Sequence, residues 1–261
     1  MKKWFTLGAI FLTSYLVFMV ATVPLPWLVN QVTLPKGLVL SGVSGTVWQG
    51  EIAQASFASN TPNNTLISNQ IQQIKTELSF WSLFTLMPKV DVVFGNELLA
   101  GPEGKLSLAM SAEQISIVDA DLFLNANDVA QQVNLPLPVT AKGEVALHLS
   151  QLDFSVSERK CQQAEGKINW SRAGIVAMKE NIKLGKLSAE IDCEKGELIV
   201  NVTPKNDLGL SFSAHINTTK AKPKLSGKGY LTPGEKFPLQ LKSVLPFLGN
   251  PDNKGRYRLG F

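Results

Sequence analysis

The sequence predicts a mainly β fold: a single N-terminal transmembrane helix, then a large, curved, mostly antiparallel β-sheet or open sandwich with one or two short helices. Three observations predict it: an uncharged N-terminal run, period-two alternation of apolar residues in most of the remaining chain, and few helical patterns. The 261 residues suffice for a substantial core. Charged residues make up only 18%, below the usual quarter, and the apolar excess is concentrated at the N-terminus.

The N-terminal run, WFTLGAIFLTSYLVFMVATV, covers residues 4–23 and carries no charge. As a helix it would be about 30 Å long, roughly the hydrocarbon thickness of a bilayer. Lys2 and Lys3 precede it, and basic residues tend to stay on the cytoplasmic side. We therefore expect a cytoplasmic tip at residues 1–3, a transmembrane helix at 4–23, a membrane-proximal segment at 24–29 and an exported, β-rich domain at 30–261.

A cleaved signal peptide is the alternative interpretation of the same run. Its apolar region would be about 7–15 residues long and would end in a small-x-small cleavage site. The sequence VATVPLPW, residues 20–27, offers no Ala-x-Ala. Pro24 and Pro26 instead stop the helix, and Trp27 suits the membrane interface. An uncleaved anchor is therefore favoured.

Charge is unevenly distributed along the chain. Residues 220–261 carry nine Lys/Arg and two acidic residues, so +7, which leaves −3 for residues 1–219 out of the total of +4. This basic end could meet anionic lipid headgroups or an acidic partner. The alternative is that its lysines keep a sheet edge soluble. Nucleic acid is disfavoured as a partner because the domain is exported.

Alternation of apolar and polar residues predicts antiparallel strands with one packed face. In LGLSFSAHIN, residues 208–217, every second residue is apolar. The pattern recurs at residues 104–111, 143–150 and 196–203. After Leu149 the apolar phase slips by one residue, to a series that begins at Leu152. Since such a slip would turn the side chains to the other face, we expect a bulge or turn near Ser150-Gln151.

A glycine followed by a charged residue opens five of the alternating runs. The pairs are Gly104-Lys105, Gly143-Glu144, Gly166-Lys167, Gly196-Glu197 and Gly227-Lys228. Their spacing is too irregular for a propeller or a solenoid of fixed period. We expect these glycines to relieve strain where each strand of a meandering sheet begins.

Helical patterns are few in the exported part. In residues 118–134, Asp119 is a candidate N-cap for a helix that would turn Leu122, Val129 and Val133 toward the sheet. A second, short helix is expected in FWSLFTLMP, residues 80–88, where Pro88 ends it. The polar residues 58–70 predict a loop. Because no linker divides the rest, we expect one domain over residues 30–261.

The stretch LSGVSGTVWQGEIAQASF, residues 40–57, places Gly42, Gly45 and Gly50 around Trp48. It matches neither glycine pattern of nucleotide-binding loops, and no helical pattern follows it to bind a phosphate. It also falls one residue short of the G-x-S-x-G nucleophile motif. We therefore expect tight turns at the glycines, with Trp48 over a sheet edge or the mouth of the sandwich. The apolar residues of the stretch expected in the core are Val43, Val47 and Ile52.

The sequence predicts no catalytic, metal or cofactor site. The two histidines, His148 and His215, lie in the polar phases of separate strands, without a partner at metal-ligand spacing. Acidic pairs such as Asp119/Asp121 have no pocket pattern around them, and we expect them to be solvated. The chain is therefore expected not to be an enzyme.

Two cysteines, Cys161 and Cys193, lie 32 residues apart in the exported part. In an oxidising compartment this predicts one disulfide between neighbouring strands, which would stabilise the fold by roughly 2–4 kcal/mol. Two inert, buried thiols are the alternative.

Several of these segments together resemble the type II secretion system protein N (general secretion pathway protein N) family. The resemblance covers most of the chain, from the Lys-rich start and single N-terminal span to residues 161–200. Its most specific parts are the G-T-x-W-x-G element, with Gly45, Trp48 and Gly50, and the block that holds Gly166 and Trp170 between the cysteines. More distantly, the strand-rich pattern is similar to AsmA-like envelope proteins.

The resemblance implies an accessory, non-enzymatic component of the bacterial inner membrane, with its β-rich domain in the periplasm. Such a protein would help the type II secretion system export folded proteins across the outer membrane through protein–protein interactions. Its implied partners are other inner-membrane components of that system and the secretin. The alternative function is that of a lipid-binding or lipid-shuttling envelope protein, with an apolar groove along the sheet.

Overall fold

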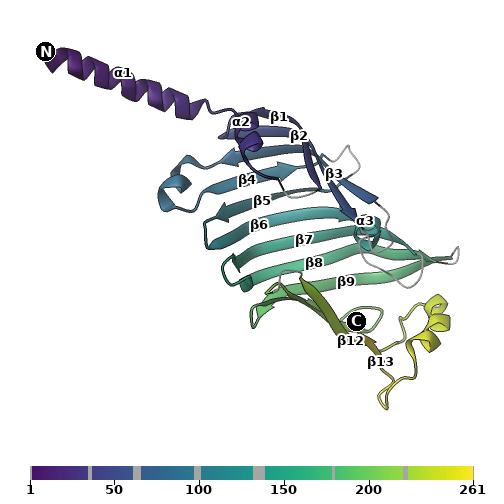
Figure 1. The fold of residues 1–261 in the computed structure, drawn as a ribbon. Helices are drawn as coiled ribbons and strands as arrows, with labels where there is room; N and C mark the ends of the chain where they lie inside the picture. Colours follow the sequence, from purple (N-terminus) through teal and green to yellow (C-terminus); the bar gives the residue numbers. More distant parts are fainter. Residues whose placement is uncertain are drawn as a thin grey trace. The chain divides into compact units, whose positions relative to one another are not determined.

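The computed structural model describes residues 2–34, 37–60, 66–96, 101–131, 139–177, 180–219 and 223–260. Its contacts divide the chain into two compact units, residues 1–100 and 101–261, which are described separately. The boundary lies inside the range 30–261 that the sequence predicts as one domain. Both units are built mainly from antiparallel strands, as the sequence predicts, and Figure 1 labels many of their elements.

In the first unit, the described residues form four strands that pair antiparallel in sequence order, so the sheet rather than the sandwich is observed. Its elements are α1 (Lys2–Ala21), α2 (Leu25–Gln31), β1 (Leu38–Gly45), β2 (Gln49–Asn60), β3 (Leu66–Leu78), the 3₁₀ helix η1 (Phe80–Thr85) and β4 (Lys89–Phe94). The short helix expected at residues 80–88 is therefore present as η1, and it ends before Pro88.

The N-terminal helix α1 ends at Ala21, ahead of the prolines. Pro26 lies in the first turn of the short helix α2, where its missing N–H leaves no helical bond unmade. Among the residues that the structure describes, no helix is both long enough and apolar enough to cross a membrane. The transmembrane helix expected at residues 4–23 stays a prediction.

The second unit is a larger antiparallel sheet, again with its described strands in sequence order. Its elements are β5 (Glu103–Met110), β6 (Gln114–Asn125), α3 (Ala126–Gln131), β7 (Thr140–Ser155), β8 (Lys160–Ala177), β9 (Glu180–Glu194), β10 (Glu197–Val202), β11 (Leu210–Asn217), β12 (Lys224–Leu231), the 3₁₀ helix η2 (Leu239–Leu248) and β13 (Tyr257–Gly260). Figure 1 shows this sheet curving between β5 and β12.

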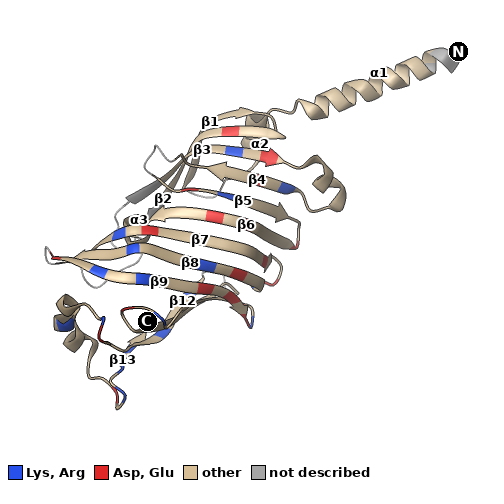
Figure 2. Ribbon diagram, turned by 180° about the vertical axis from the view of Figure 1, so that it is seen from behind, with Lys and Arg blue, Asp and Glu red and all other residues tan. Residues whose placement is uncertain are grey.

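The strand registers give the second sheet one apolar and one polar face, because residues directly opposite each other share a face. An apolar row crosses β6 to β11 and consists of Leu122, Leu147, Ile168, Ala189, Val202 and Phe212. The next row is polar; it consists of Lys105, Asp121, His148, Lys167, Glu190, Asn201, Ser213 and Lys228. Figure 2 colours the charged residues of the unit.

The bulge expected near Ser150 is confirmed. In the pairing of β7 with β8, Leu149 lies opposite Gly166 and Gln151 lies opposite Glu165, so Ser150 has no partner on β8. Leu152 then lies opposite Ala164, two residues before Gly166. The bulge therefore absorbs the phase slip and returns Leu152 to the apolar face.

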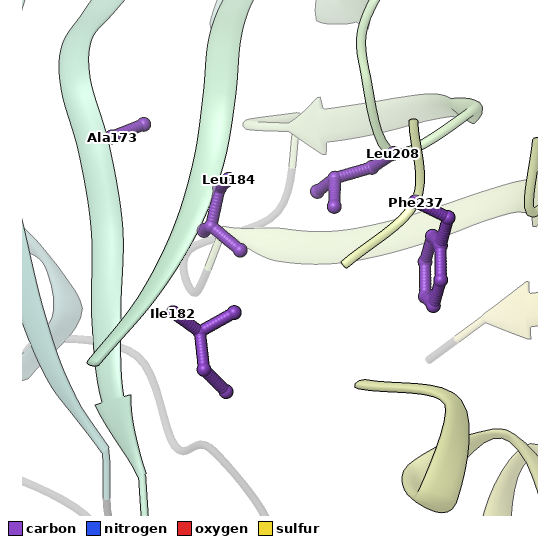
Figure 3. Packing of buried hydrophobic residues seen from close by; sticks show 5 residues of the cluster. All are labelled: Ala173, Ile182, Leu184, Leu208 and Phe237. Atoms are coloured by element: carbon purple, nitrogen blue, oxygen red, sulfur yellow. The ribbon is translucent and has the colours of Figure 1, made fainter. Parts of the chain in front are cut away.

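A small core lies at one end of this apolar face. Ile182 and Leu184 of β9 pack with Leu208, which precedes β11, and with Phe237, which follows β12 (Figure 3). All four side chains are less than 10% exposed. The curvature of the sheet thus closes a core against the segment that leads into η2, although these residues are far apart in sequence.

The helix expected over residues 118–134 is mostly wrong. Residues 118–125 belong to β6, and the helix, α3, begins only at Ala126. Asp119 caps nothing; it adopts a positive φ of 50° at an irregularity in the pairing of β5 with β6. The amide N–H of Asn127 instead donates to Asn125 Oδ1 at 2.9 Å. Val133 lies outside the described residues.

Two further expectations need correction. Strands β2 and β3 extend into both ends of the loop expected at residues 58–70, up to Asn60 and from Leu66, and residues 61–65 lie outside the described part. Of the five glycine–charge pairs, those at Gly104 and Gly196 mark strand starts, whereas the other three lie inside strands. At Gly166 a Cβ atom would lie 2.8 Å from Leu149 Cδ1, so close approach of two strands explains that glycine.

Candidate functional site

Trp48 connects the N-terminal helix to the first sheet. Its indole Nε1 donates a hydrogen bond to the carbonyl oxygen of Val20, in the last turn of α1, at 2.9 Å. Its ring also packs against Phe80 of η1, with centroids 5.5 Å apart. The sequence predicts Trp48 over a sheet edge or a sandwich mouth; in the structure it lies between a helix end and a 3₁₀ helix.

The backbone around Trp48 is fixed by a tight turn between β1 and β2. Gly45 has a φ of +85°, which favours glycine, as expected. Thr46 N–H donates to Gln49 O at 2.9 Å, and Gln49 N–H donates to Thr46 Oγ1 at 3.2 Å. Val47 N–H donates to Val23 O at 3.0 Å, which ties the turn to the chain leaving α1. These bonds hold Trp48 next to the last turn of α1.

Gly50 leaves room for the helix α2. It is buried, and an added Cβ atom would overlap Leu25 Cδ2 and lie 2.7 Å from Thr76 Oγ1. The G-T-x-W-x-G element therefore has a structural explanation: Gly45 and Thr46 make the turn, Trp48 holds α1, and Gly50 lets α2 pack. The other predicted core residues of this stretch, Val43, Val47 and Ile52, are half-buried.

An open pocket of about 820 Å³ lies at this junction within the first unit. Its apolar lining comes from the end of α1, from the β1–β2 turn and from the start of η1, and includes Leu16, Val17, Val20, Trp48, Leu78 and Phe80. Sequence reasoning missed this pocket and the packing of Leu25. The available signal was the series of apolar residues that begins between the two prolines, at Leu25, which predicts a short helix with a face to bury.

Trp170 makes an equivalent bond in the second unit. Its Nε1 donates to the carbonyl oxygen of Lys142 at 2.9 Å, and the residue packs beside the core of β8 and β9. Gly143, which follows that carbonyl, has a φ of +100°, and a Cβ there would meet the carbonyl oxygens of Ser171 and Arg172. Trp170 thus links β8 to β7 at the bulge in their pairing where Gly143 lies.

The disulfide between Cys161 and Cys193 is present, with Cα atoms 5.8 Å apart. It joins neighbouring strands, as expected, because β8 pairs with β9. The amide N–H of Cys161 also donates to Gly196 O at 3.0 Å. The disulfide and this hydrogen bond therefore both connect the start of β8 to the segment where β9 turns into β10. Gly166, the other predicted residue of this block, is buried mid-strand.

Each of the two histidines lies beside a single carboxylate. His148 Nδ1 contacts Asp121 Oδ1, and this hydrogen bond holds the pKa of Asp121 below its ordinary value. His215 Nδ1 lies 3.4 Å from a Glu197 carboxylate oxygen. Within the described part of the chain, no group of three or more His, Cys, Asp or Glu side chains could hold a metal ion.

The basic C-terminal region is partly paired. Arg256 binds Asp252 through Nη2 at 2.7 Å and through Nε at 2.8 Å, and its guanidinium lies 4.4 Å from the ring centre of Tyr230. This hydrogen-bonded pair lowers the pKa of Asp252 to about 2. Lys236 lies 3.8 Å from Asp207. Lys220, Lys222 and Phe261 lie outside the described residues.

Comparison with known proteins gives a consistent result. The family model described as type II secretion system (T2SS), protein N matches residues 36–260. The chain is similar to a type II secretion system protein N of Aeromonas hydrophila, with 29% identity over 100% of this chain and 98% of the relative. A type II secretion system protein N of Vibrio cholerae serotype O1 is 26% identical over 98% of this chain and 97% of its own length. No solved structure matches the chain.

Proposed function

Since the chain belongs to the type II secretion system protein N family, we propose that it is an accessory inner-membrane component of that secretion system. It helps folded proteins leave the periplasm across the outer membrane by contacting other proteins, and it catalyses no reaction. The observation that carries this proposal is the family match over residues 36–260. Its partners in this proposal are other inner-membrane components and the secretin.

The N-terminal helix is the membrane anchor in this proposal, with residues 1–3 in the cytoplasm and the β-rich part in the periplasm. From Trp4 to Ala21, α1 carries no charge, and its large apolar side chains, such as Phe11 and Phe18, are exposed. Exposed apolar residues around a whole helix favour a lipid environment. The bond from Trp48 to Val20 supports a fixed connection between the anchor and the first sheet.

The outer edge of β1 is the docking surface in this proposal. Among the described residues, β1 pairs with β2 on one side, and beyond it the structure records only the single bridge between Pro24 and Thr46. Val39, the second residue of this strand, is 62% exposed. An open strand edge can accept a strand from a partner protein through main-chain hydrogen bonds.

Deletion of the chain followed by complementation tests this function in secreting cells. The exported fraction of a secreted protein should fall on deletion and recover with the wild-type chain. Val39→Lys should fail to restore it, because a lysine on an edge strand opposes pairing. Val93→Lys is the matched control, since Val93 is 52% exposed on β4 and should tolerate the charge.

Unchanged secretion after deletion would contradict an accessory role in export. Recovery with Val39→Lys would contradict docking at the β1 edge and leave the family role intact. Failure of both lysine variants would show that charge anywhere on this unit is harmful, which also contradicts a specific edge.

A second candidate function, lipid binding along the second sheet, is favoured by one observation. Of the apolar row of β6 to β11, only Ala189 is buried, and the other members are half-buried. A row of apolar side chains across six strands would normally be covered by a second layer. Phospholipid that stays with the chain after delipidating purification, and is lost in Leu147→Glu, would support this function; its absence would exclude it.

A further inference from the structure

The segment that follows β3 exposes an unusual number of large apolar side chains. Residues 78–88, LSFWSLFTLMP, contain no charged residue. Within them, the segment 80–86, here named the aromatic loop, holds Trp81, Phe84 and Leu86, which are 78%, 71% and 83% exposed. Exposed patches of this kind mark interaction or membrane sites. In Figure 1 the aromatic loop is the coiled segment between β3 and β4, and it projects from its sheet.

Polar groups of the aromatic loop bond to one another and to the residues that flank it. Ser82 Oγ donates to Ser79 O at 2.6 Å and accepts from Lys89 N–H at 2.8 Å. Thr85 Oγ1 donates to Ser82 O at 2.7 Å. The aromatic side chains also pack on one another, with Phe80 and Phe84 centroids 5.5 Å apart. A loop with satisfied polar groups can leave water at low cost.

The loop lies beside the end of α1. Phe80 packs against Trp48, whose indole bonds to Val20 in the last turn of the helix. Phe80 and Val20 also line the same pocket. If α1 lies in a bilayer, its last turn lies near the membrane surface, and so does the loop. Trp is typical of that depth, and Phe and Leu are common on the membrane-facing side of segments that lie in the interface.

We propose that the aromatic loop inserts Trp81, Phe84 and Leu86 into the periplasmic leaflet of the membrane that holds α1. Its ligand is the phospholipid interface: acyl chains for Phe84 and Leu86, and the headgroup level for Trp81. The continuity of the loop with the apolar helix, through Phe80 and Trp48, selects lipid over a protein partner. The proposal rests on the proposed anchoring role of α1.

Photo-crosslinking of the full chain in vesicles of phosphatidylethanolamine and phosphatidylglycerol tests this insertion. Three variants carry p-benzoylphenylalanine: Phe84→p-benzoylphenylalanine in the loop, Phe11→p-benzoylphenylalanine in α1, and Val39→p-benzoylphenylalanine in β1. Val39 is the matched control, because it is a similarly exposed apolar residue of the same unit. Mass spectrometry then identifies phospholipid adducts. Leu86→p-benzoylphenylalanine is a second loop variant, should the first fail to fold.

The positions Phe11 and Phe84 should both form phospholipid adducts, roughly tenfold more than Val39, because in this proposal they lie in the bilayer, where apolar side chains partition, whereas Val39 faces water. Adducts from Phe11 but from neither loop position would overturn the insertion and leave the anchor in place. No adducts from Phe11 or from the loop would overturn both proposals. Adducts from the loop to a second copy of the chain, or equal lipid adducts from Val39, would also overturn a lipid-specific loop.

Discussion

Trp48 and Val20 are joined by a hydrogen bond of 2.9 Å from the indole Nε1 to the main-chain carbonyl oxygen. The carbonyl groups in the last turn of a helix have no partner within the helix, so the indole satisfies one of them. The bond also fixes where α1 leaves the first sheet. Trp48, one of the residues on which the family resemblance rests, thus has a structural role: it holds the end of the helix against the sheet.

Replacing Trp48 by Phe should loosen this junction. Trp48→Phe keeps an aromatic ring against Phe80 but removes the donor to Val20, which costs about 1 kcal/mol. Amide hydrogen exchange in residues 46–50 should therefore accelerate roughly fivefold. Trp27→Phe is the control, because Trp27 is exposed. Equal exchange in the two variants would show that the indole bond contributes nothing.

A methyl group at Gly50 should displace α2. In Gly50→Ala the new Cβ would overlap Leu25 and crowd Thr76, and overpacking of this kind costs about 1–3 kcal/mol. Limited proteolysis should then cut residues 25–31 faster than in the wild-type chain. Gly234→Ala should not change the cleavage rate, since nothing lies within 4 Å of a Cβ at that position. Unchanged cleavage of Gly50→Ala would contradict the packing of α2 on Gly50.

Removal of the disulfide should destabilise the second unit. The double variant Cys161→Ala with Cys193→Ala loses a cross-link over 32 residues, worth roughly 2–4 kcal/mol by loop-closure entropy. Urea unfolding followed by circular dichroism measures the loss. In the wild-type chain, an alkylating reagent should label neither cysteine before reduction and both after it. Labelling without reduction would mean that the bond does not form.

The acidic group at the C-terminal turn should titrate unusually low. Arg256 lowers the pKa of Asp252 from 3.8 to about 2. The pair therefore stabilises the folded chain fully at pH values above 3.8, the ordinary pKa of the carboxyl group. That stability is lost as the pH falls from 3.8 toward about 2. In Arg256→Gln the pKa of Asp252 should rise toward 3.8, as measured by carboxyl NMR. Lys254→Gln is the control, and a rise of equal size there would point to general charge instead.

The strand pattern was predictable from the sequence because alternation follows directly from the geometry of a strand. The phase slip after Leu149 located the bulge at Ser150, since only an extra residue can restore the apolar face. The helix predicted from Asp119 was wrong because an acidic residue ahead of apolar ones is also the pattern of a helix N-cap. Asp119 lies instead at an irregularity inside β6, which pairing with β5 and β7 holds in extended form.

The junction at Trp48 could not be predicted, because it depends on contacts between segments distant in sequence. The sequence identified Gly45, Trp48 and Gly50 as markers but gave no sign that they meet Val20 and Leu25. The closed core at Phe237 was missed for the same reason, since it forms only when the second sheet curves. Local patterns predict elements, and tertiary contacts decide what their side chains touch.

The most direct test of the proposed function is to crosslink the full chain in the envelope of cells that secrete, and to identify what purifies with it. We expect covalent adducts with other components of the type II secretion system, which Val39→Lys reduces and Val93→Lys does not. Recovery of phospholipid with no secretion component attached would contradict it, and would favour lipid binding by the apolar row of the second sheet.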